Sequence, residues 1–586
     1  MTPEAFPGTI TPELLSEPPA ERVRLGAWLA LSCCLIAVAV QMVDMTIVNI
    51  ALPSLGSDLR ASSGQQLLVL TAYTLAFACI LLTASRLGER VGRRRMFIGA
   101  LAGFTVASVL CGTAQGATEL IAVRGVQGAC AALAAAQTIA IISDSFPKSR
   151  HGIIFGIYGA TAGVAAMLGP TLGGLLISAD LFGLGWRTIF LVNLPLGIVA
   201  CLIGYRFLPA LAPTSRPSLD VPGITLSTAG LFLLVYPLAT GREHGWPTWQ
   251  VTMLAASLIL LAFFVTHERR LAARGGDPLL KLELLSIRSF AVGSTLSLFF
   301  FGVFAAFFFT VSVTAQFGLG YSALRTGLLT LPFAIGAAVG SLLSPVLARY
   351  VGPRTLTVGA LAFAGSLAYT AITVDPAAGI EIPTIIAPLA VGGVGMGLFV
   401  APLQATMLSG TSPDNVGSAS GTIPTVQQVG ASIGMAVISL LFFNQVAAQS
   451  DKAVSQVQAS LTRDLTSTSV APSMQPFVVN EFTRCATAQL ASAHPDAPAP
   501  GCPDTSDSPD AASGDMRASI TAAAEPALRP AARQAASLTF LSAFDVVLWA
   551  LAGISATLAL LTFGLRRREA GSAVPTPSQI IDSVPH

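Results

Sequence analysis

Two stretches of the chain, LGERVGRRR (87–95) and LARYVGPRT (347–355), share a pattern at an offset of 260 residues. Leu, Val, Gly and Arg occupy matching positions in both, and each stretch follows a long apolar run. This pattern predicts a duplicated unit in the chain. The alternative is two similar basic turns at the membrane-facing ends of unrelated helices.

The composition places the apolar runs in a membrane. Of the 586 residues, 53% are hydrophobic and 11% are charged, whereas a soluble domain carries about 25% charged residues. We therefore expect an all-α integral membrane protein in contact with the lipid bilayer. The net charge is +2, and no basic patch is interleaved with aromatic residues, so we expect no nucleic-acid partner. No Cys/His cluster is present, and we expect no bound metal.

Fourteen apolar stretches are long enough to cross about 30 Å of hydrocarbon, which requires roughly 20 residues. They lie near 28–50, 65–85, 96–115, 118–142, 152–178, 187–207, 222–240, 249–267, 289–313, 323–347, 355–373, 383–409, 415–443 and 538–565. A cytoplasmic N-terminus places 21 of the 32 Lys and Arg residues in inner segments and four in short outer loops. This asymmetry follows the positive-inside rule and predicts a multi-pass protein of the cell membrane with both termini cytoplasmic.

Eight predicted helices separate the two related stretches, which is two more than a six-helix duplication requires. The extra pair is most economically placed at 222–267. The expected organisation is an N-terminal tail (1–27), an N-terminal six-helix half (28–207), two additional helices with flanking loops (208–288), a C-terminal six-helix half (289–565) and a C-terminal tail (566–586).

Residues 444–537 contain too much Ser, Asp, Pro and Ala for a membrane span and are expected to form an extracellular insert between the last two helices. Within it, DKAVSQVQASLTRDL has some helical spacing. Cys485 and Cys502 are the only cysteines outside the apolar runs. In an oxidising exterior they could form a disulfide; the alternative leaves two exposed thiols.

One carboxylate, Asp44, lies well inside the first apolar run, within QMVDMTIVNIALP (41–53). A charge there costs roughly 2.5–3.5 kcal/mol, and intramembrane acids usually mark ion pathways. Arg124, within LIAVRGVQGACAA (120–132), lies at a similar depth. A nearby arginine favours the charged carboxylate, whereas burial favours the neutral form. Gln127 could hydrogen-bond either group. We expect Asp44 and Arg124 to couple protons to transport, a structural ion pair being the alternative.

Together these stretches resemble the fourteen-helix drug:proton antiporter branch of the major facilitator superfamily, over about 28–443 and 538–565. SRLGERVGRRR (85–95) is similar to the family's loop between helices two and three, and GIYGATAGVAAMLGPTLGG (156–174) resembles the antiporter signature of helix five. The resemblance implies a conformational role for Glu89, Arg90, Gly92 and Arg93 in the loop, and for Gly169, Pro170, Gly173 and Gly174 in the helix. Positive-inside anchoring and small-residue packing are the respective alternatives.

The resemblance also covers GWRTIFLVNLPLG (185–197), the start of helix six, where we expect a structural role for Asn193. It implies the major facilitator fold, with two six-helix halves plus two extra helices. The implied function is a proton-coupled secondary transporter that exports small lipophilic drugs or similar molecules by alternating access. The energy source would be the proton gradient, with no cofactor, and the functional unit a monomer.

Two alternative functions use the same machinery: export of an endogenous metabolite or lipid, and proton-coupled import, against which the GPxxGG motif argues. We expect no enzymatic activity, because no polar catalytic cluster is found at membrane depth and no GxxxxGK[ST] loop is present. Candidate substrate-binding residues are polar or aromatic side chains expected to face a cavity between the halves, although an aromatic stripe can equally face lipid or the core. They are Gln41, Met42, Tyr73, Gln127, Gln137, Phe300, Phe304, Phe308, Gln404 and Gln427.

Overall fold

The computed structural model describes residues 25–562, except 210–217, 242–243, 353, 376–381, 413–414, 492–501 and 503–515. The two predicted terminal tails lie largely outside the described residues. Within this part of the chain, 14 helices are long and apolar enough to cross a membrane. This number confirms the sequence-based count.

The first group of helices comprises α1 (Leu25–Asp58), α2 (Ser63–Val91), α3 (Arg93–Thr113), α4 (Ala117–Ser145), α5 (His151–Ala179), α6 (Thr188–Leu191) and α7 (Asn193–Phe207). The central pair is α8 (Val221–Thr240) and α9 (Thr248–Ala273). The last group comprises α10 (Arg288–Val313), α11 (Ala323–Val351), α12 (Arg354–Thr373), α13 (Ile382–Ser409), α14 (Val416–Leu465), α15 (Gln475–Ala491) and α16 (Met516–Leu561).

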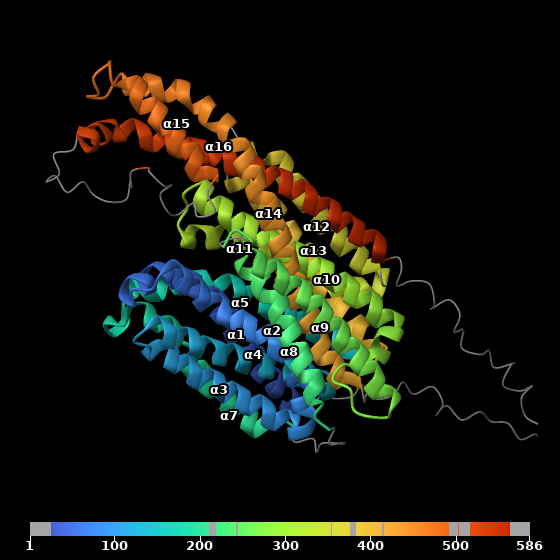
Figure 1. The fold of residues 1–586 in the computed structure, drawn as a ribbon. Helices are drawn as coiled ribbons and strands as arrows, with labels where there is room; N and C mark the ends of the chain where they lie inside the picture. Colours follow the sequence, from blue (N-terminus) through green and yellow to red (C-terminus); the bar gives the residue numbers. More distant parts are fainter. Residues whose placement is uncertain are drawn as a thin grey trace, which may run out of the picture.

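The helices form two bundles, with α1–α7 in one and α10–α16 in the other (Figure 1). The bundles meet where α5 packs on α11 and α13, and where α2 packs on α14. Helices α8 and α9 pack on each other, and α8 also contacts α2 and α14. The extra pair therefore lies beside the junction of the two bundles.

Helix α14 differs from the sequence-based expectation. It runs for 50 residues, Val416–Leu465, whereas hydropathy ends the helix at 443. Its partner α16 begins at Met516, well before the predicted start at 538. These two predicted bounds are wrong because both helices continue beyond their apolar parts. The continuation is stabilised by its own packing: Val454, Val457 and Leu461 recur at helical spacing and are fully or almost fully buried.

The insert between the last two spans is therefore substantially helical in its described part. Helix α15 packs on the extensions of α14 and α16, and the three helices project together beyond the bundles (Figure 1). The structure joins Cys485 of α15 to Cys502 in a disulfide, with a Cα–Cα distance of 5.7 Å.

Candidate functional site

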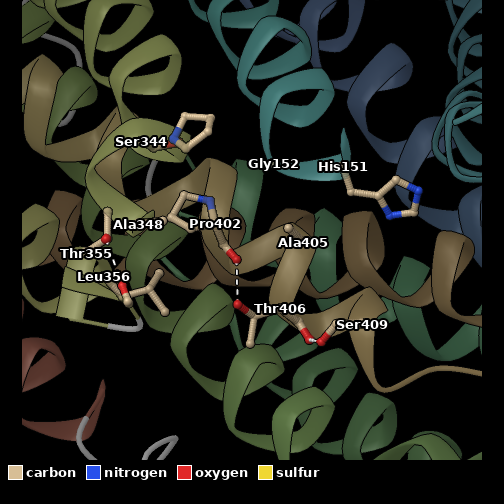
Figure 2. Close-up of a pocket in the computed structure, with 12 residues that line it drawn as sticks. His151, Gly152, Ser344, Ala348, Thr355, Leu356, Pro402, Ala405, Thr406 and Ser409 are labelled. Carbon is tan, nitrogen blue, oxygen red and sulfur yellow. Dashed lines mark hydrogen bonds between the residues drawn. The ribbon is translucent and has the colours of Figure 1, made fainter. Parts of the chain in front are cut away.

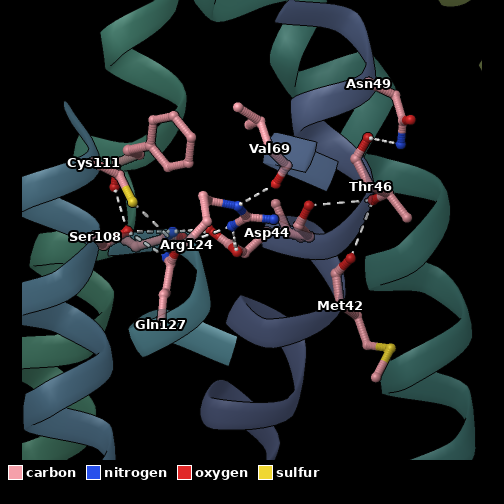
Figure 3. Close-up of polar contacts among 12 residues, drawn as sticks. Met42, Asp44, Thr46, Asn49, Val69, Ser108, Cys111, Arg124 and Gln127 are labelled. Atoms are coloured by element: carbon pink, nitrogen blue, oxygen red, sulfur yellow. Dashed lines mark hydrogen bonds and ion pairs between the residues drawn. The ribbon is translucent and has the colours of Figure 1, made fainter. Parts of the chain in front are cut away.

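The charged group inside α1 is enclosed by polar partners from three other helices. Asp44 is fully buried, and its Oδ2 lies 2.6 Å from the Arg124 Nη1 of α4. Its Oδ1 accepts hydrogen bonds from Gln127 Nε2 and Asn193 Nδ2, each at 2.9 Å. Ser108 of α3 accepts from both amides, at 3.1 and 2.8 Å. Figure 3 shows this cluster gathered around the ion pair.

Arg124 is held on every side and is 1% exposed. Its Nε donates to the Val69 carbonyl at 3.3 Å, and its Nη1 also donates to Gln127 Oε1 at 2.8 Å. The guanidinium carbon lies 4.5 Å from the centre of the Tyr73 ring and 5.7 Å from that of Phe190, distances typical of cation–π contacts. The arginine would therefore keep several partners if the carboxylate lost its charge.

The sequence analysis predicted the proximity of Asp44, Arg124 and Gln127 but not the parts played by Asn193 and Ser108. Asn193 is the first residue of α7 and is 1% exposed. One indication was available in the sequence: Asn193 is an amide side chain within an apolar run. Burying an amide costs free energy unless it forms a hydrogen bond. The hydroxyl of Ser108 gave a weaker signal, because a serine in a membrane helix can bond its own backbone.

The glycine-rich helix α5 lies between α1 and α11. A Cβ at Gly169 would lie 1.9 Å from the Thr46 Oγ1 of α1, and one at Gly173 would lie 2.9 Å from Ile47 Cγ1. On the side of the other bundle, a Cβ at Gly156 would lie 2.6 Å from the Ser341 carbonyl oxygen. Thus α5 contacts both the helix that carries Asp44 and the opposite bundle.

Pro170 lies in the same helix and takes part in the contact with the second bundle. A Cβ at Gly327 of α11 would lie 3.3 Å from Pro170 Cβ. Gly174, one turn further on, faces Leu324 of α11 at ordinary contact distance. The residues singled out in this helix therefore lie at two interfaces, Gly169 and Gly173 on α1 and Pro170 and Gly174 on α11.

The C-terminal end of α2 forms the other contact between the bundles. Glu89 Oε2 pairs with Arg86 Nη1 at 2.7 Å. The Glu89 carboxylate also faces the first turn of α14, because a Cβ at Gly417 would lie 1.6 Å from its Oε1. A negative charge at a helix N-terminus is favourable. Arg86 was not among the predicted site residues, although it lies in the quoted motif.

The other residues predicted for this motif lie where α2 ends and α3 begins. Arg93 pairs with Asp144 at the end of α4. Gly92 has φ +98°, a conformation that glycine adopts readily and other residues rarely do. Arg90 is exposed.

The predicted substrate residues differ in burial and in the contacts that they make. Four are half-buried: Met42, Phe304, Phe308 and Gln427. The other six are buried, and several of them already have partners. The ring of Phe300 stacks on Phe399 with the ring centres 4.3 Å apart. Gln137 donates to the Ala84 carbonyl at 2.7 Å, and the Tyr73 ring covers Arg124.

A pocket of about 290 Å³ lies between the bundles at the start of α5. His151 and Gly152 line it from the first bundle, and residues of α11, α12 and α13, such as Pro402 and Thr406, line it from the second. Figure 2 shows these residues around the opening. The pocket is on the side of the arginine-rich loop, and none of the predicted substrate residues is among those that line it.

A separate ion pair closes the opposite end of the first bundle. The Asp58 carboxylate at the end of α1 accepts from the side chains of Arg187 and Trp186. These two hydrogen bonds hold the pKa of Asp58 below its usual value. The carboxylate is therefore ionised at neutral pH and fixes the entry into α6.

Comparisons with known proteins agree with this architecture. The profile of the Major Facilitator Superfamily matches residues 34–435. The chain is 35% identical over 460 residues to the probable actinorhodin transporter of Streptomyces coelicolor, covering 78% of this chain and 80% of that protein. It is 36% identical over 431 residues to the puromycin resistance protein of Streptomyces alboniger, covering 72% and 83%.

A solved structure shares the fold. The human organic anion transporter MFSD10 (TETRAN) superposes with a TM-score of 0.50 at 16% identity, covering 72% of this chain and 93% of that one. The fourteen apolar helices make this a multi-pass membrane protein, and the family match together with the relatives described as transporters identifies it as a transporter for small molecules rather than an enzyme. The chain belongs to the Major Facilitator Superfamily.

Proposed function

We propose that this protein exports small lipophilic molecules, antibiotics among them, in exchange for protons, and that Asp44 carries the proton. The observation that supports this most directly is the fully buried Asp44 carboxylate with three hydrogen-bond donors around it. An ionisable group so deep in a membrane protein is costly and is usually kept for function.

Protonation of Asp44 would change the network in a defined way. A neutral carboxyl group offers a weaker acceptor to Arg124 and gains a proton that must itself be donated. Arg124 would keep Val69, Gln127 and the Tyr73 ring as partners. The ion pair could therefore open without leaving the guanidinium unpartnered, which would otherwise be strongly unfavourable.

The α1–α5–α11 contacts provide a route from the carboxylate to the opposite bundle. Thr46 and Ile47 follow Asp44 on α1 and touch the glycines of α5. Because these contacts leave no space for a side chain, a small shift of α1 must be followed by α5. Since α5 also packs on α11, the shift reaches the interface that alternating access has to rearrange.

The proposed substrate class comes from the named relatives. One relative is described as a puromycin resistance protein and another as a probable actinorhodin transporter. We propose that this chain likewise transports antibiotic-sized molecules. It would do so as a monomer in the cell membrane, with both termini cytoplasmic and the arginine-rich loops inside.

Transport into proteoliposomes tests the proposal. Protein oriented inside-out, with an acidic lumen, should accumulate puromycin when the proton gradient is present. Asp44→Asn should lower gradient-driven accumulation at least tenfold and should retain puromycin binding, because the neutral amide imitates the protonated acid. Asp464→Asn is the control, since Asp464 is exposed near the end of α14 and lies outside the network, and its variant should transport at the parent rate.

Three outcomes would count against parts of the proposal. Undiminished accumulation by Asp44→Asn would show that another group carries the proton. Accumulation only in right-side-out vesicles would identify an importer. Proton movement driven by a lipid or metabolite, but by none of a panel of antibiotics, would favour the endogenous-substrate alternative.

A further inference from the structure

We propose that Asp220, His267 and Glu268 form a binding site for a divalent transition-metal ion where α8 begins and α9 ends. The three residues offer ligand atoms that all lie within 4.8 Å of one another. Nothing in the proposed transport cycle uses this cluster, and the sequence analysis expected no metal. The pair of helices that carries it is the pair inserted between the two halves.

The two carboxylates of the cluster each have one oxygen without a hydrogen-bond partner. Asp220 Oδ1 caps α8 by accepting from the Gly223 amide at 3.0 Å and lies 2.8 Å from His267 Nε2. Glu268 Oε2 accepts from the Leu280 amide at 2.9 Å. Asp220 Oδ2 and Glu268 Oε1 are buried and accept no hydrogen bond from an N–H or O–H donor, the two carboxyl groups lie close enough to share a proton, and Glu268 is fully buried.

These two free oxygens face the same small space. A Cβ at Gly223 would lie 2.0 Å from Asp220 Oδ2 and 2.6 Å from Glu268 Oε1. The absence of a side chain at Gly223 therefore lets two carboxylates approach each other beneath the first turn of α8. Two adjacent negative charges in a buried position are strongly unfavourable unless a cation or a proton lies with them.

Arg86 forms no hydrogen bond with either carboxylate, because it is engaged with Glu89 Oε2 and with the carbonyl oxygens of Pro278 and Leu279. Two carboxylates match the charge of a divalent ion, and the imidazole adds a nitrogen donor. One nitrogen and two oxygen donors suit zinc and similar metals. Ligands at about 2.0–2.2 Å from one zinc ion lie up to roughly 4.4 Å apart, so small side-chain movements would close the site.

A bound ion would connect the extra helices to the contact between the bundles. The segment 277–281 carries both the Leu280 amide bound to Glu268 and the carbonyl groups bound to Arg86. Its last residue, Lys281, bonds Asn415 and Ser418 at the start of α14. The proposed site is therefore hydrogen-bonded to a segment that contacts α2, α9 and α14.

Metal binding to the purified, tag-free protein tests the inference. After treatment with a chelator, the protein in nanodiscs is titrated with Co²⁺, followed by visible absorption, and with Zn²⁺, followed by calorimetry. The parent should bind one equivalent with a tetrahedral or five-coordinate Co²⁺ spectrum. His267→Ala and Glu268→Gln should each weaken binding at least tenfold, while His244→Ala, at the other ends of α8 and α9, should bind as the parent does.

Two results would overturn the metal site. One is binding that Glu268→Gln leaves unchanged. The other is a parent protein that binds no metal and shows the infrared carbonyl band of a protonated carboxyl group, with Glu268→Gln removing that band. This result would show that the two carboxylates share a proton instead. Size-exclusion profiles and melting temperatures of the variants distinguish loss of the site from loss of the fold, and Glu268→Gln preserves the shape of the buried side chain.

Discussion

At the scale of single residues, the site depends on how completely Asp44 is surrounded. Each of its oxygens is engaged, and the partners come from α4 and α7. Such an arrangement stabilises the carboxylate only while all of the donors are present, because a buried charge that loses a partner is costly. The amide of Asn193 is therefore as much a part of the site as Arg124, although it carries no charge.

This reasoning predicts the effect of removing Asn193. Asn193→Ala takes one hydrogen bond from Asp44 and one from Ser108, and it should lower the free energy of unfolding by about 1.5–3 kcal/mol, the range for bonds to charged groups. Thermal unfolding in detergent measures the change. Asn49→Ala is the control, since Asn49 is exposed and donates to the carbonyl of Thr46 one turn earlier in the same helix; it should change stability by less than about 0.5 kcal/mol.

A double-mutant cycle sharpens this test. If Asn193 acts through Asp44, the loss from Asn193→Ala should shrink by at least about 0.5 kcal/mol in the Asp44→Asn background. Additive effects of the two substitutions would contradict the assigned contact.

Charge in apolar runs made part of the site predictable. Asp44 and Arg124 interrupt two hydrophobic segments, and only mutual pairing makes both tolerable in lipid. Asn193 and Ser108 give no comparable signal, because one neutral polar residue in a span can be satisfied by water, by backbone or by another helix. Arg86 was obscured for a different reason: its neighbours in the motif are also arginines, and sequence does not tell which of them bonds Glu89.

At the scale of helices, α5 is the element of the first bundle that packs on both α1 and the second bundle. Its glycines allow close contact with α1 on one face and with α11 on the other. Close contact gives dispersion energy and also leaves little tolerance for added volume. The two faces can therefore be tested separately by single methyl groups.

Gly156→Ala should separate α5 from α11. The new Cβ would lie 2.6 Å from the Ser341 carbonyl oxygen, a contact with backbone that only a helix shift can relieve, and overpacking of this kind costs about 1–3 kcal/mol. Gly163→Ala is the matched control on the same helix, because its Cβ would meet Ala337 Cβ at an ordinary 3.8 Å. Melting temperature and puromycin transport should fall for Gly156→Ala alone; equal behaviour of the two variants would contradict the close contact.

Helix α14 shows why the ends of a helix are difficult to predict from hydropathy. Hydropathy marks the point at which a helix leaves the membrane, and it predicted an end at 443. Backbone hydrogen bonding does not require apolar surroundings, so α14 continues to Leu465 as long as its buried valines and leucines pack on α15 and α16. The spacing of DKAVSQVQASLTRDL gave the correct indication, and composition alone did not.

At the scale of the molecule, the two bundles touch at two separate places, one at the start of α11 and one at the start of α14. Pro170 and Gly174 of α5 meet α11 near its start, and Ser85 and Glu89 of α2 meet α14 near its start. The repeat between 87–95 and 347–355 predicted two related halves, and the lengths of the apolar stretches gave the correct number of spans. The contacts between halves depend on shape, which no single stretch of sequence reveals.

A disulfide across the α2–α14 contact should arrest transport. A Cβ at Gly421 would lie 2.8 Å from Ser85 Cβ, so Ser85→Cys and Gly421→Cys together place two thiols within reach after slight separation of the helices. Oxidation should reduce puromycin transport at least tenfold, and dithiothreitol should restore it. Each single variant under oxidant is the control. Full transport by the cross-linked protein would show that this contact need not open.

The length of α14 has a practical consequence. At 1.5 Å per residue its 50 residues extend for about 75 Å, well beyond the roughly 30 Å of the hydrocarbon layer. The portion outside the lipid packs on α15 and α16, so it should rotate together with the second bundle as one rigid unit. Dyes placed at its far tip and on the first bundle would convert a rotation of a few degrees at mid-bilayer into a displacement large enough to follow in single molecules.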